Sequence, residues 1–437
     1  MKTKANVGHL IQNRIGSELP VIERAHGVWL VDSADNEYID GCSGAVVANI
    51  GHSHPRVLQA LKTQADKVTF VHRGAFASQA MYDAADKLCQ ATGYAGAWFV
   101  GSGSEAVEAA LQFALQYHRE SGDDGRSWFL SHARSYHGNT LGALSLSGHA
   151  RRAVAGELAY DFHTLPSPYE ARTTSDGPQQ GVHALLAEVE SQINSRPGKI
   201  AGIVVEPVSG ATLGANVLPA GYLEGLRELC DQYGILLIAD EVMTGMGRTG
   251  RMLAVDHWGV RPDLIALGKG LGAGYTPVAA TVLNPRVLNA ITHGSGRILG
   301  GHTYGGNPLS VAVASAVLDV LRDEDLVAAG EAAGEFLAAG LQKIAFRYPL
   351  VVETRGLGML QALEFHNPGL AVGAVAEMIR QEAFAQGLVV YPTTGGFNDA
   401  CIIAPPLTIT KGETLELLDR LDRAIQMVAA TLHQRTA

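Results

Sequence analysis

The sequence has few cysteines, few charged residues and no long hydrophobic run. Its four cysteines lie far apart and form no CxxC pair, which argues against a disulfide framework or a structural zinc site. No apolar stretch reaches the ~18 residues of a membrane-spanning helix. The N-terminal residues contain no apolar core typical of a secretory signal. We therefore expect a cytoplasmic protein with no membrane partner.

The net charge and the glycine content exclude further classes of protein. The 33 basic and 43 acidic residues leave a formal net charge of −10, so no nucleic-acid partner is expected. Hydrophobic residues make up 47% and charged residues 17% of the 437 positions, a composition that excludes global disorder. The 51 glycines follow no G-X-Y period, so they indicate loops and close backbone contacts rather than collagen.

Between about residues 80 and 310, short apolar runs alternate with helical patterns. The runs lie at 97–100, 127–130, 200–205, 234–239 and 263–267. They are continuous rather than alternating, as is typical of strands buried on both faces. This order predicts an α/β fold with a mostly parallel sheet covered by helices.

A different pattern follows Pro308. Helices are expected at 309–321, 326–346, 374–386 and 414–432, and short strands at 351–354, 359–365, 388–391 and 401–404. We predict three parts: an N-terminal segment, residues 1–60, that includes a hairpin and joins the small domain; a large domain, residues 61–310; and a small α+β domain, residues 311–437.

One candidate phosphate site lies between a predicted strand and a predicted helix. Gly103 and Ser104 stand at the start of that helix, where free backbone N–H groups and the positive dipole end attract anions. The segment is neither a Walker A loop nor a G-x-G-x-x-G fingerprint. A tight turn with a serine N-cap is the alternative interpretation.

Two further residues stand at the ends of neighbouring apolar runs. Asp240 closes one run, and Lys269 follows the next run 29 residues later. An acid there can pair with a protonated heterocycle, cap a helix or bind a metal, but no third carboxylate or spaced histidine pair supports a metal site. A desolvated lysine can form a Schiff base. Together with a phosphate cradle, this pair suits pyridoxal phosphate.

The sequence resembles the class III aminotransferases, the ω-amine and ω-amino-acid subgroup of fold-type I pyridoxal-phosphate enzymes. The matching stretches, in order, are GSGSEAVEAAL, SYHGNTLGALS, VVEPVSG, LLIADEVMTGMGRTG, LGKGLGAG and GGHTYGGNPLS. The resemblance spans roughly residues 15–430. It implies a seven-stranded, mostly parallel sheet and a homodimer with shared sites.

The resemblance also implies roles for the residues at these motifs. Lys269 would form the aldimine with the cofactor and move the substrate proton. Asp240 would hold the pyridinium N–H, so that the ring acts as an electron sink. Gly103 and Ser104 would bind the phosphate through the start of the helix.

Five more positions carry over from the family in the same way. Tyr136, followed by His137, would stack on one face of the cofactor ring, and Val242 would pack on the other. Glu206 would belong to the polar network around the strand-end aspartate. Thr303 would reach the phosphate of the neighbouring subunit.

Two departures from the family pattern concern the substrate. Met243 stands where many members that use 2-oxoglutarate have glutamine, and residues 396–407 contain no arginine to bind a substrate carboxylate. Arg355 is the nearest alternative and is interpreted as structural. We therefore expect transfer from an amine or ω-amino acid, whose reacting end lacks a carboxylate, to pyruvate rather than 2-oxoglutarate.

Other functions remain open at this point. An aminomutase, racemase or epimerase of the same fold would use the same lysine and cofactor without releasing the amine to an external acceptor. A cofactor-binding regulator is disfavoured because no DNA-binding domain or basic stripe accompanies the fold. A nicotinamide dehydrogenase is disfavoured because no G-x-G-x-x-G opens a βαβ unit.

Overall fold

The computed structural model describes residues 9–13, 15–16, 18–169 and 178–436. A seven-stranded sheet forms the centre of the larger part. Its strands, in spatial order, are β4 (Gly96–Val100), β12 (Ala279–Leu283), β11 (Leu264–Leu267), β10 (Leu236–Asp240), β7 (Ile200–Val205), β5 (Trp128–His132) and β6 (His163–Leu165). β12 runs antiparallel to both of its neighbours, and the other pairs are parallel. The predicted mostly parallel sheet is confirmed.

The two faces of this sheet bury alternate side chains of the same strand. Leu236 and Ile238 of β10 pack in one core cluster with α4 (Gly103–Glu120), α5 (Leu141–Leu146) and α9 (Pro285–His293). Leu237 and Ala239 pack in the other cluster with α7 (Pro178–Ser195) and α8 (Tyr222–Tyr233). All five residues of β10 are buried, which is why its sequence is a continuous apolar run before Asp240.

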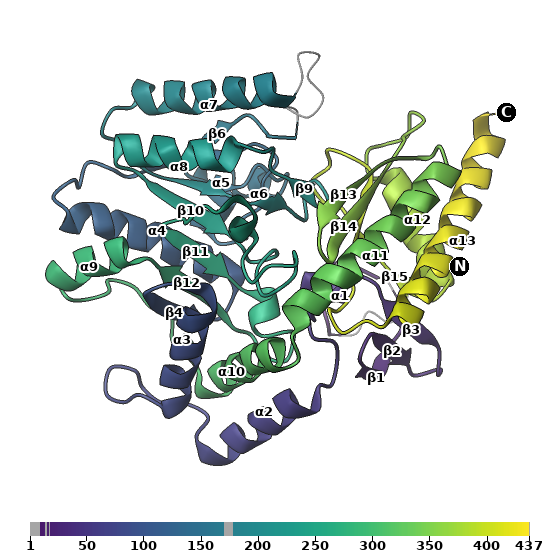
Figure 1. The fold of residues 1–437 in the computed structure, drawn as a ribbon, viewed down its shortest axis with the longest axis horizontal. Helices are drawn as coiled ribbons and strands as arrows, with labels where there is room; N and C mark the ends of the chain where they lie inside the picture. Colours follow the sequence, from purple (N-terminus) through teal and green to yellow (C-terminus); the bar gives the residue numbers. More distant parts are fainter. Residues whose placement is uncertain (1–8, 14, 17, 170–177, 437) are drawn as a thin grey trace.

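Three further helices complete the lower part of this unit in Figure 1. They are α2 (Pro55–Lys67), α3 (Gln79–Thr92) and α10 (Pro308–Asp323), and α10 packs on both α2 and α3. The short elements of the chain are α1 (Ser43–Val46), α6 (Arg152–Ala155), η1 (Gly156–Leu158), β8 (Val208–Ser209), β9 (Asn216–Val217), η3 (Ala254–Trp258) and η4 (Lys269–Leu271).

The C-terminal unit lies beside the large sheet (Figure 1). Its antiparallel sheet has the order β13 (Val351–Leu357), β14 (Leu360–Phe365), β17 (Ala400–Ile403) and β16 (Tyr391–Pro392). Its helices are α11 (Leu326–Arg347), α12 (Ala374–Ala385) and α13 (Lys411–Thr436). Among the helices that the structure describes, none combines the length and apolar character needed to cross a membrane.

The N-terminal strands join this C-terminal unit through one parallel pairing. β1 (Ile22–His26), β2 (Trp29–Asp32) and β3 (Glu37–Asp40) form an antiparallel sheet, to which β15 (Leu388–Val389) adds alongside β3. The expected single strand at 388–391 is therefore wrong. The chain divides at Val390, so β15 pairs with β3 whereas β16 pairs with β17. The domain boundaries at residues 60 and 310 stay predictions.

A buried arginine connects three segments of the fold. Arg248 is 1% exposed, and its Nη1 donates to the carbonyl oxygens of Ala404, at 3.1 Å, and Pro405, at 2.6 Å. Its Nη2 donates to Ser43 Oγ at 3.1 Å. Burial lowers the pKa of the guanidinium to about 10. Because these partners are mostly neutral carbonyls, the side chain acts as a hydrogen-bonding bridge between the N-terminal segment, the large unit and the C-terminal unit.

We expect Arg248→Met to destabilise the protein by about 2 kcal/mol, because buried carbonyl groups lose their donors while the aliphatic volume is largely kept. The midpoint of urea unfolding measures this change. Arg251→Met is the matched control, since Arg251 is 54% exposed at its side chain and reaches Glu331 only at 3.5 Å, an exposed pair worth under about 1 kcal/mol. Equal shifts for the two variants would contradict the assignment.

Candidate active site

A cavity of about 190 Å³ opens at the carboxyl edge of the large sheet. Its lining residues are Gly103, Ser104, Tyr136, His137, Gly138, Glu206, Val208, Ala211, Asp240, Val242, Met243 and Lys269. The parallel strands β5, β7, β10 and β11 all end at this edge, which is where ligands bind in open α/β sheets. The structure thus brings together all the site residues predicted from the sequence except Thr303.

Thr303 lies elsewhere, in the turn that precedes α10. It is exposed and is not among the residues that line the cavity. Sequence reasoning missed Gly138, Val208 and Ala211 as lining residues. Gly138 belongs to a matching motif and could have been found there, whereas the small side chains of Val208 and Ala211 carry no chemical signal.

The start of α4 is capped, yet two of its amide groups stay free for a ligand. Ser102 Oγ accepts a hydrogen bond from the Glu105 amide at 3.2 Å, and Glu105 Oε2 accepts one from the Gly101 amide at 2.6 Å. Gly103 and Ser104 occupy the first two helical positions, whose N–H groups have no acceptor within the helix. The serine N-cap and the anion site are therefore compatible at this turn.

Two glycines allow the backbone to approach closely around the cavity. A Cβ atom on Gly103 would lie 2.6 Å from Val242 Cγ1, and one on Gly138 would lie 2.6 Å from Ser104 Oγ. Gly138 also has a φ of +136°, which side chains disfavour. Both positions therefore require glycine, and Val242 can pack directly against the first turn of α4.

Asp240 forms a buried pair with His137. His137 Nδ1 donates to Asp240 Oδ2 at 2.8 Å, and the Val242 amide donates to Oδ1 at 3.1 Å. Burial opposes a charge on the imidazole, but the hydrogen bond and charge of Asp240, with the charge of Glu206, raise the pKa of His137. The Nε2 atom of His137 is buried without a partner. Asp240 thus presents at the cavity wall a carboxyl group that is held in place by two hydrogen bonds.

Lys269 lines the same cavity and is half-buried. Its φ of +40° is unusual for a side chain of this kind, and such strain is common at functional sites. Burial lowers the pKa of the ammonium to about 8, although the charges of Asp240 and Glu206 act in the opposite direction. An amine with this pKa is available as a base or nucleophile near neutral pH.

Glu206 directly follows β7 and lies beside these groups. Its Oε2 accepts from the Tyr136 amide at 3.2 Å and from Ser209 Oγ at 3.4 Å, and its Oε1 accepts from the Gly210 amide at 3.4 Å. Burial raises the pKa of this carboxyl to about 7; the charge of His137 lowers it and that of Asp240 adds to the rise. Glu206 is therefore a buried acid that can hold a proton near neutral pH.

Arg355 does not face this cavity as a free cation. Its Nη1 contacts Glu353 Oε2 at 2.8 Å and Glu364 Oε2 at 2.5 Å. Its Nε donates to the carbonyl of Gly214 at 2.7 Å, and its Nη2 donates to that of Leu213 at 2.5 Å. The interpretation of Arg355 as structural agrees with these contacts, because its donors are already engaged.

The residues that line the cavity have the chemistry needed to hold pyridoxal phosphate. The free amides at the start of α4 suit a phosphate, the buried Asp240 carboxylate suits a protonated ring nitrogen, and the desolvated Lys269 amine suits a carbonyl carbon. Tyr136 and Val242 supply an aromatic and an aliphatic surface in the same lining. Within the described ranges, no group of three or more His, Cys, Asp or Glu residues is placed to hold a metal ion.

Comparisons with known proteins agree with this fit. The family model for class III aminotransferases matches residues 11–425. An uncharacterized aminotransferase of Bacillus subtilis, YodT, is 40% identical over 97% of this chain and 99% of its own length. Ornithine aminotransferase 2 of Staphylococcus saprophyticus is 36% identical over 92% of this chain and 93% of its own.

A solved structure is similar across the same length. It is an amine transaminase from an uncultivated Pseudomonas species in the pyridoxal-phosphate-bound form, with a TM-score of 0.88, 35% identity, and coverage of 94% of this chain and 95% of its own. The chain belongs to the class III aminotransferases. It is a fold-type I enzyme with pyridoxal phosphate as its cofactor, as the sequence predicted.

The raised pKa of Glu206 predicts how stability depends on pH. Its carboxyl has a pKa of about 7 when folded, against an ordinary 4.5. The stabilisation from this proton is therefore full below pH 4.5 and is lost as pH rises through 7. In the apoprotein, Glu206→Gln should gain unfolding free energy relative to wild type by up to about 3 kcal/mol between pH 5 and 8. Urea unfolding at several pH values measures this, and a difference independent of pH would contradict it.

Proposed function

We propose that this enzyme transfers an amino group from an amine or ω-amino acid to pyruvate, with Lys269 and Asp240 as its catalytic residues. The arrangement that carries this proposal is the pair of neighbouring strand ends, where β10 presents Asp240 and β11 leads into Lys269 around one cavity. The similar proteins support the donor class, since one is called an amine transaminase and another an ornithine aminotransferase.

The cofactor, when bound, supplies an electron sink for the substrate carbon that loses a proton. Asp240 would accept a hydrogen bond from the proton-bearing ring nitrogen of the cofactor, and the 2.8 Å hydrogen bond from His137 orients its carboxyl group. Lys269 Nζ would take the proton from the substrate carbon and pass it on rather than give it back to the same carbon, a task suited to its pKa of about 8. Glu206 belongs to the polar network beside this pair.

The remaining site residues hold the cofactor in place. The amide groups of Gly103 and Ser104 would bind its phosphate at the start of α4. Tyr136 would cover one face of its ring and Val242 the other. These roles are supported by the position of all four residues in the lining of one cavity.

The acceptor is proposed from what the cavity contains. Met243 lines it where a glutamine is common in relatives that use 2-oxoglutarate, and its sulfur lies so close to Gly210 that a Cβ atom there would be 2.0 Å away. Arg355 is engaged elsewhere. Among the described residues that line the cavity, Lys269 and His137 are the basic side chains and no arginine is present. A second carboxylate, as in 2-oxoglutarate, therefore has no arginine in this lining to pair with, whereas pyruvate carries only one carboxylate.

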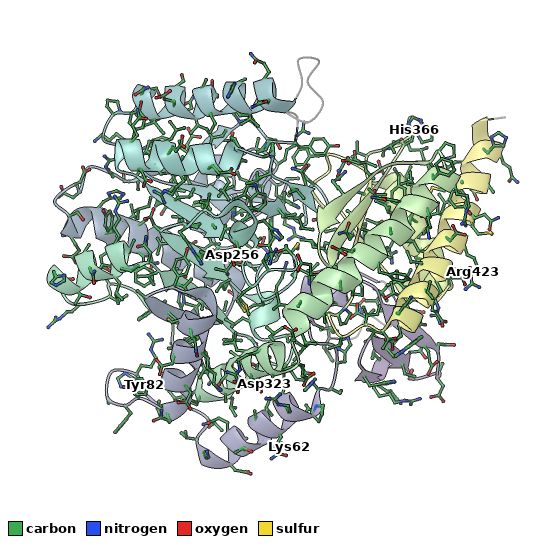
Figure 2. The ribbon with its side chains drawn as sticks, in the orientation of Figure 1. Lys62, Tyr82, Asp256, Asp323, His366 and Arg423 are labelled. Atoms are coloured by element: carbon green, nitrogen blue, oxygen red, sulfur yellow. The ribbon has the colours of Figure 1, made fainter. Side chains whose placement is uncertain are left out.

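We further propose that the active enzyme is a homodimer in which Thr303 reaches the neighbouring site. A second cavity of about 680 Å³ is lined by apolar side chains that include Phe76, Tyr82 and Ile298. Phe76 is 68% and Tyr82 59% exposed, and Figure 2 shows Tyr82 at the edge of the molecule. Tyr304, next to Thr303, is also exposed. An apolar surface of this kind suits a second copy of the chain.

The first experiment is an absorption titration of the holoenzyme. We expect amines or ω-amino acids to bleach the visible cofactor band, and pyruvate to restore it faster than 2-oxoglutarate does. Lys269→Ala should lower the rate of bleaching by roughly 10³-fold. The control is Lys62→Ala, at an exposed lysine of α2 (Figure 2). Preference for 2-oxoglutarate would refute the acceptor, and amine conversion without use of a keto acid would favour an aminomutase, racemase or epimerase.

Substitutions that place charged side chains on this apolar surface test the homodimer. Phe76→Glu combined with Tyr82→Glu should shift the protein from dimer to monomer in sedimentation, because buried carboxylates without partners disfavour association. Phe346→Glu is the control, since Phe346 of α11 is exposed and lies outside that cavity lining. Thr303→Ala should weaken cofactor binding without changing the sedimentation. A wild-type monomer, or a charged variant that stays dimeric, would contradict this interface.

A further inference from the structure

The proposed reaction leaves one substrate group without a partner. Pyruvate, like every 2-keto acid, carries a carboxylate beside its reacting carbonyl, and a partly desolvated carboxylate requires a cation or several donors. The stretch 396–407 supplies no arginine. The guanidinium groups of Arg355 and Arg248 already donate to other residues of the chain. Arg134 stacks on Phe397, with its Cζ 5.0 Å from the ring centre.

Arg151 is a cation that contacts Tyr136, a residue of the cavity lining. Its Cζ lies 5.5 Å from the centre of the Tyr136 ring, and its Nη1 donates to Tyr136 Oη at 3.4 Å. Tyr136 lines the cavity that also contains Lys269. Arg151 is exposed, and no carboxylate of the described residues forms an ion pair with it.

The backbone around Arg151 is held by His149. The Arg151 amide donates to His149 Nδ1 at 3.0 Å, so His149 Nε2 carries the proton and donates to Thr394 Oγ1 at 3.3 Å. Burial and the charge of Arg151 lower the pKa of His149, which therefore stays neutral and does not compete for an anion. The His149 ring also packs against Tyr136, with centroids 5.4 Å apart.

This turn meets the segment that lacks the family's arginine. Thr394 lies just before residues 396–407, and its amide donates to the carbonyl of Ala211, which lines the cavity. The charge of Arg151 also acts on Tyr391. Residues 396–407 bring no arginine to this side of the cavity. The turn after α5 supplies a cation there instead, in the form of Arg151.

We propose that Arg151 binds the carboxylate of the keto acid acceptor at the mouth of the active site. This assignment rests on the proposed transamination and deepens it. The guanidinium offers a planar fork that matches a carboxylate, and Tyr136 fixes one of its ends. Because the group is exposed, an amine without a carboxylate can enter while the guanidinium keeps its contact with water. The same site can then bind both an amine donor that lacks a carboxylate and a keto acid acceptor that carries one.

Half-reactions of the holoenzyme test this role. The aminated enzyme is mixed with pyruvate or with methyl pyruvate, which keeps the carbonyl but has no charge. Arg151→Gln should lower the second-order rate constant for pyruvate by roughly 10- to 100-fold and change that for methyl pyruvate less than twofold. Arg151→Lys should fall between wild type and Arg151→Gln. The amine half-reaction with a donor that lacks a carboxylate should keep its wild-type rate.

The neighbouring Arg152→Gln is the matched control and should leave every rate unchanged, since Arg152 contacts the Tyr160 carbonyl at 3.1 Å and lies 3.9 Å from Asp161. Equal losses for pyruvate and methyl pyruvate in Arg151→Gln would assign Arg151 to the support of Tyr136 and overturn the proposal. An unchanged rate for pyruvate would overturn it as well. A wild-type enzyme that reacts with no keto acid would instead refute transamination itself.

Discussion

The hydrogen bond between His137 and Asp240 is the interaction on which the active site depends. A carboxylate in the wall of a buried cavity is stable only when it is paired or well hydrogen-bonded. Asp240 receives one bond from the His137 ring and one from the Val242 amide. The charge of Asp240 acts on two neighbouring groups: it raises the pKa of His137 and contributes to the raised pKa of Glu206.

The charge of Asp240 also affects the pKa of Lys269. Desolvation alone would lower the pKa of its ammonium further, and the two carboxylates limit that fall, so that it ends near 8. The amine is thus poised between its charged and neutral forms close to neutral pH. The parallel sheet makes this possible, since β10 and β11 are neighbours and their carboxyl ends deliver both groups to one place.

Close packing is the second requirement of the site. Val242 lies against the first turn of α4 only because residue 103 has no Cβ, and Ser104 lies against residue 138 for the same reason. The predicted cofactor residues therefore come from motifs rich in glycine. In contrast, the edge of the site depends on polar contacts between two turns, where the buried His149 meets the exposed Arg151 and Thr394. The buried wall suits a cofactor, and the exposed edge suits substrates that come and go.

The sequence by itself determined the sheet, the family, and the group of residues around Lys269 and Asp240. Strands buried on both faces need continuous apolar runs, and a tightly packed cofactor pocket restricts its residue types and spacing, so both leave local signals. Tertiary structure decided the rest. The pairing at Val390 divided one expected strand between two sheets, and Arg355 found its partners in distant carbonyls and glutamates. The position of Arg151 and the pKa values of Glu206 and His137 depend on through-space distance and desolvation, which no local pattern encodes.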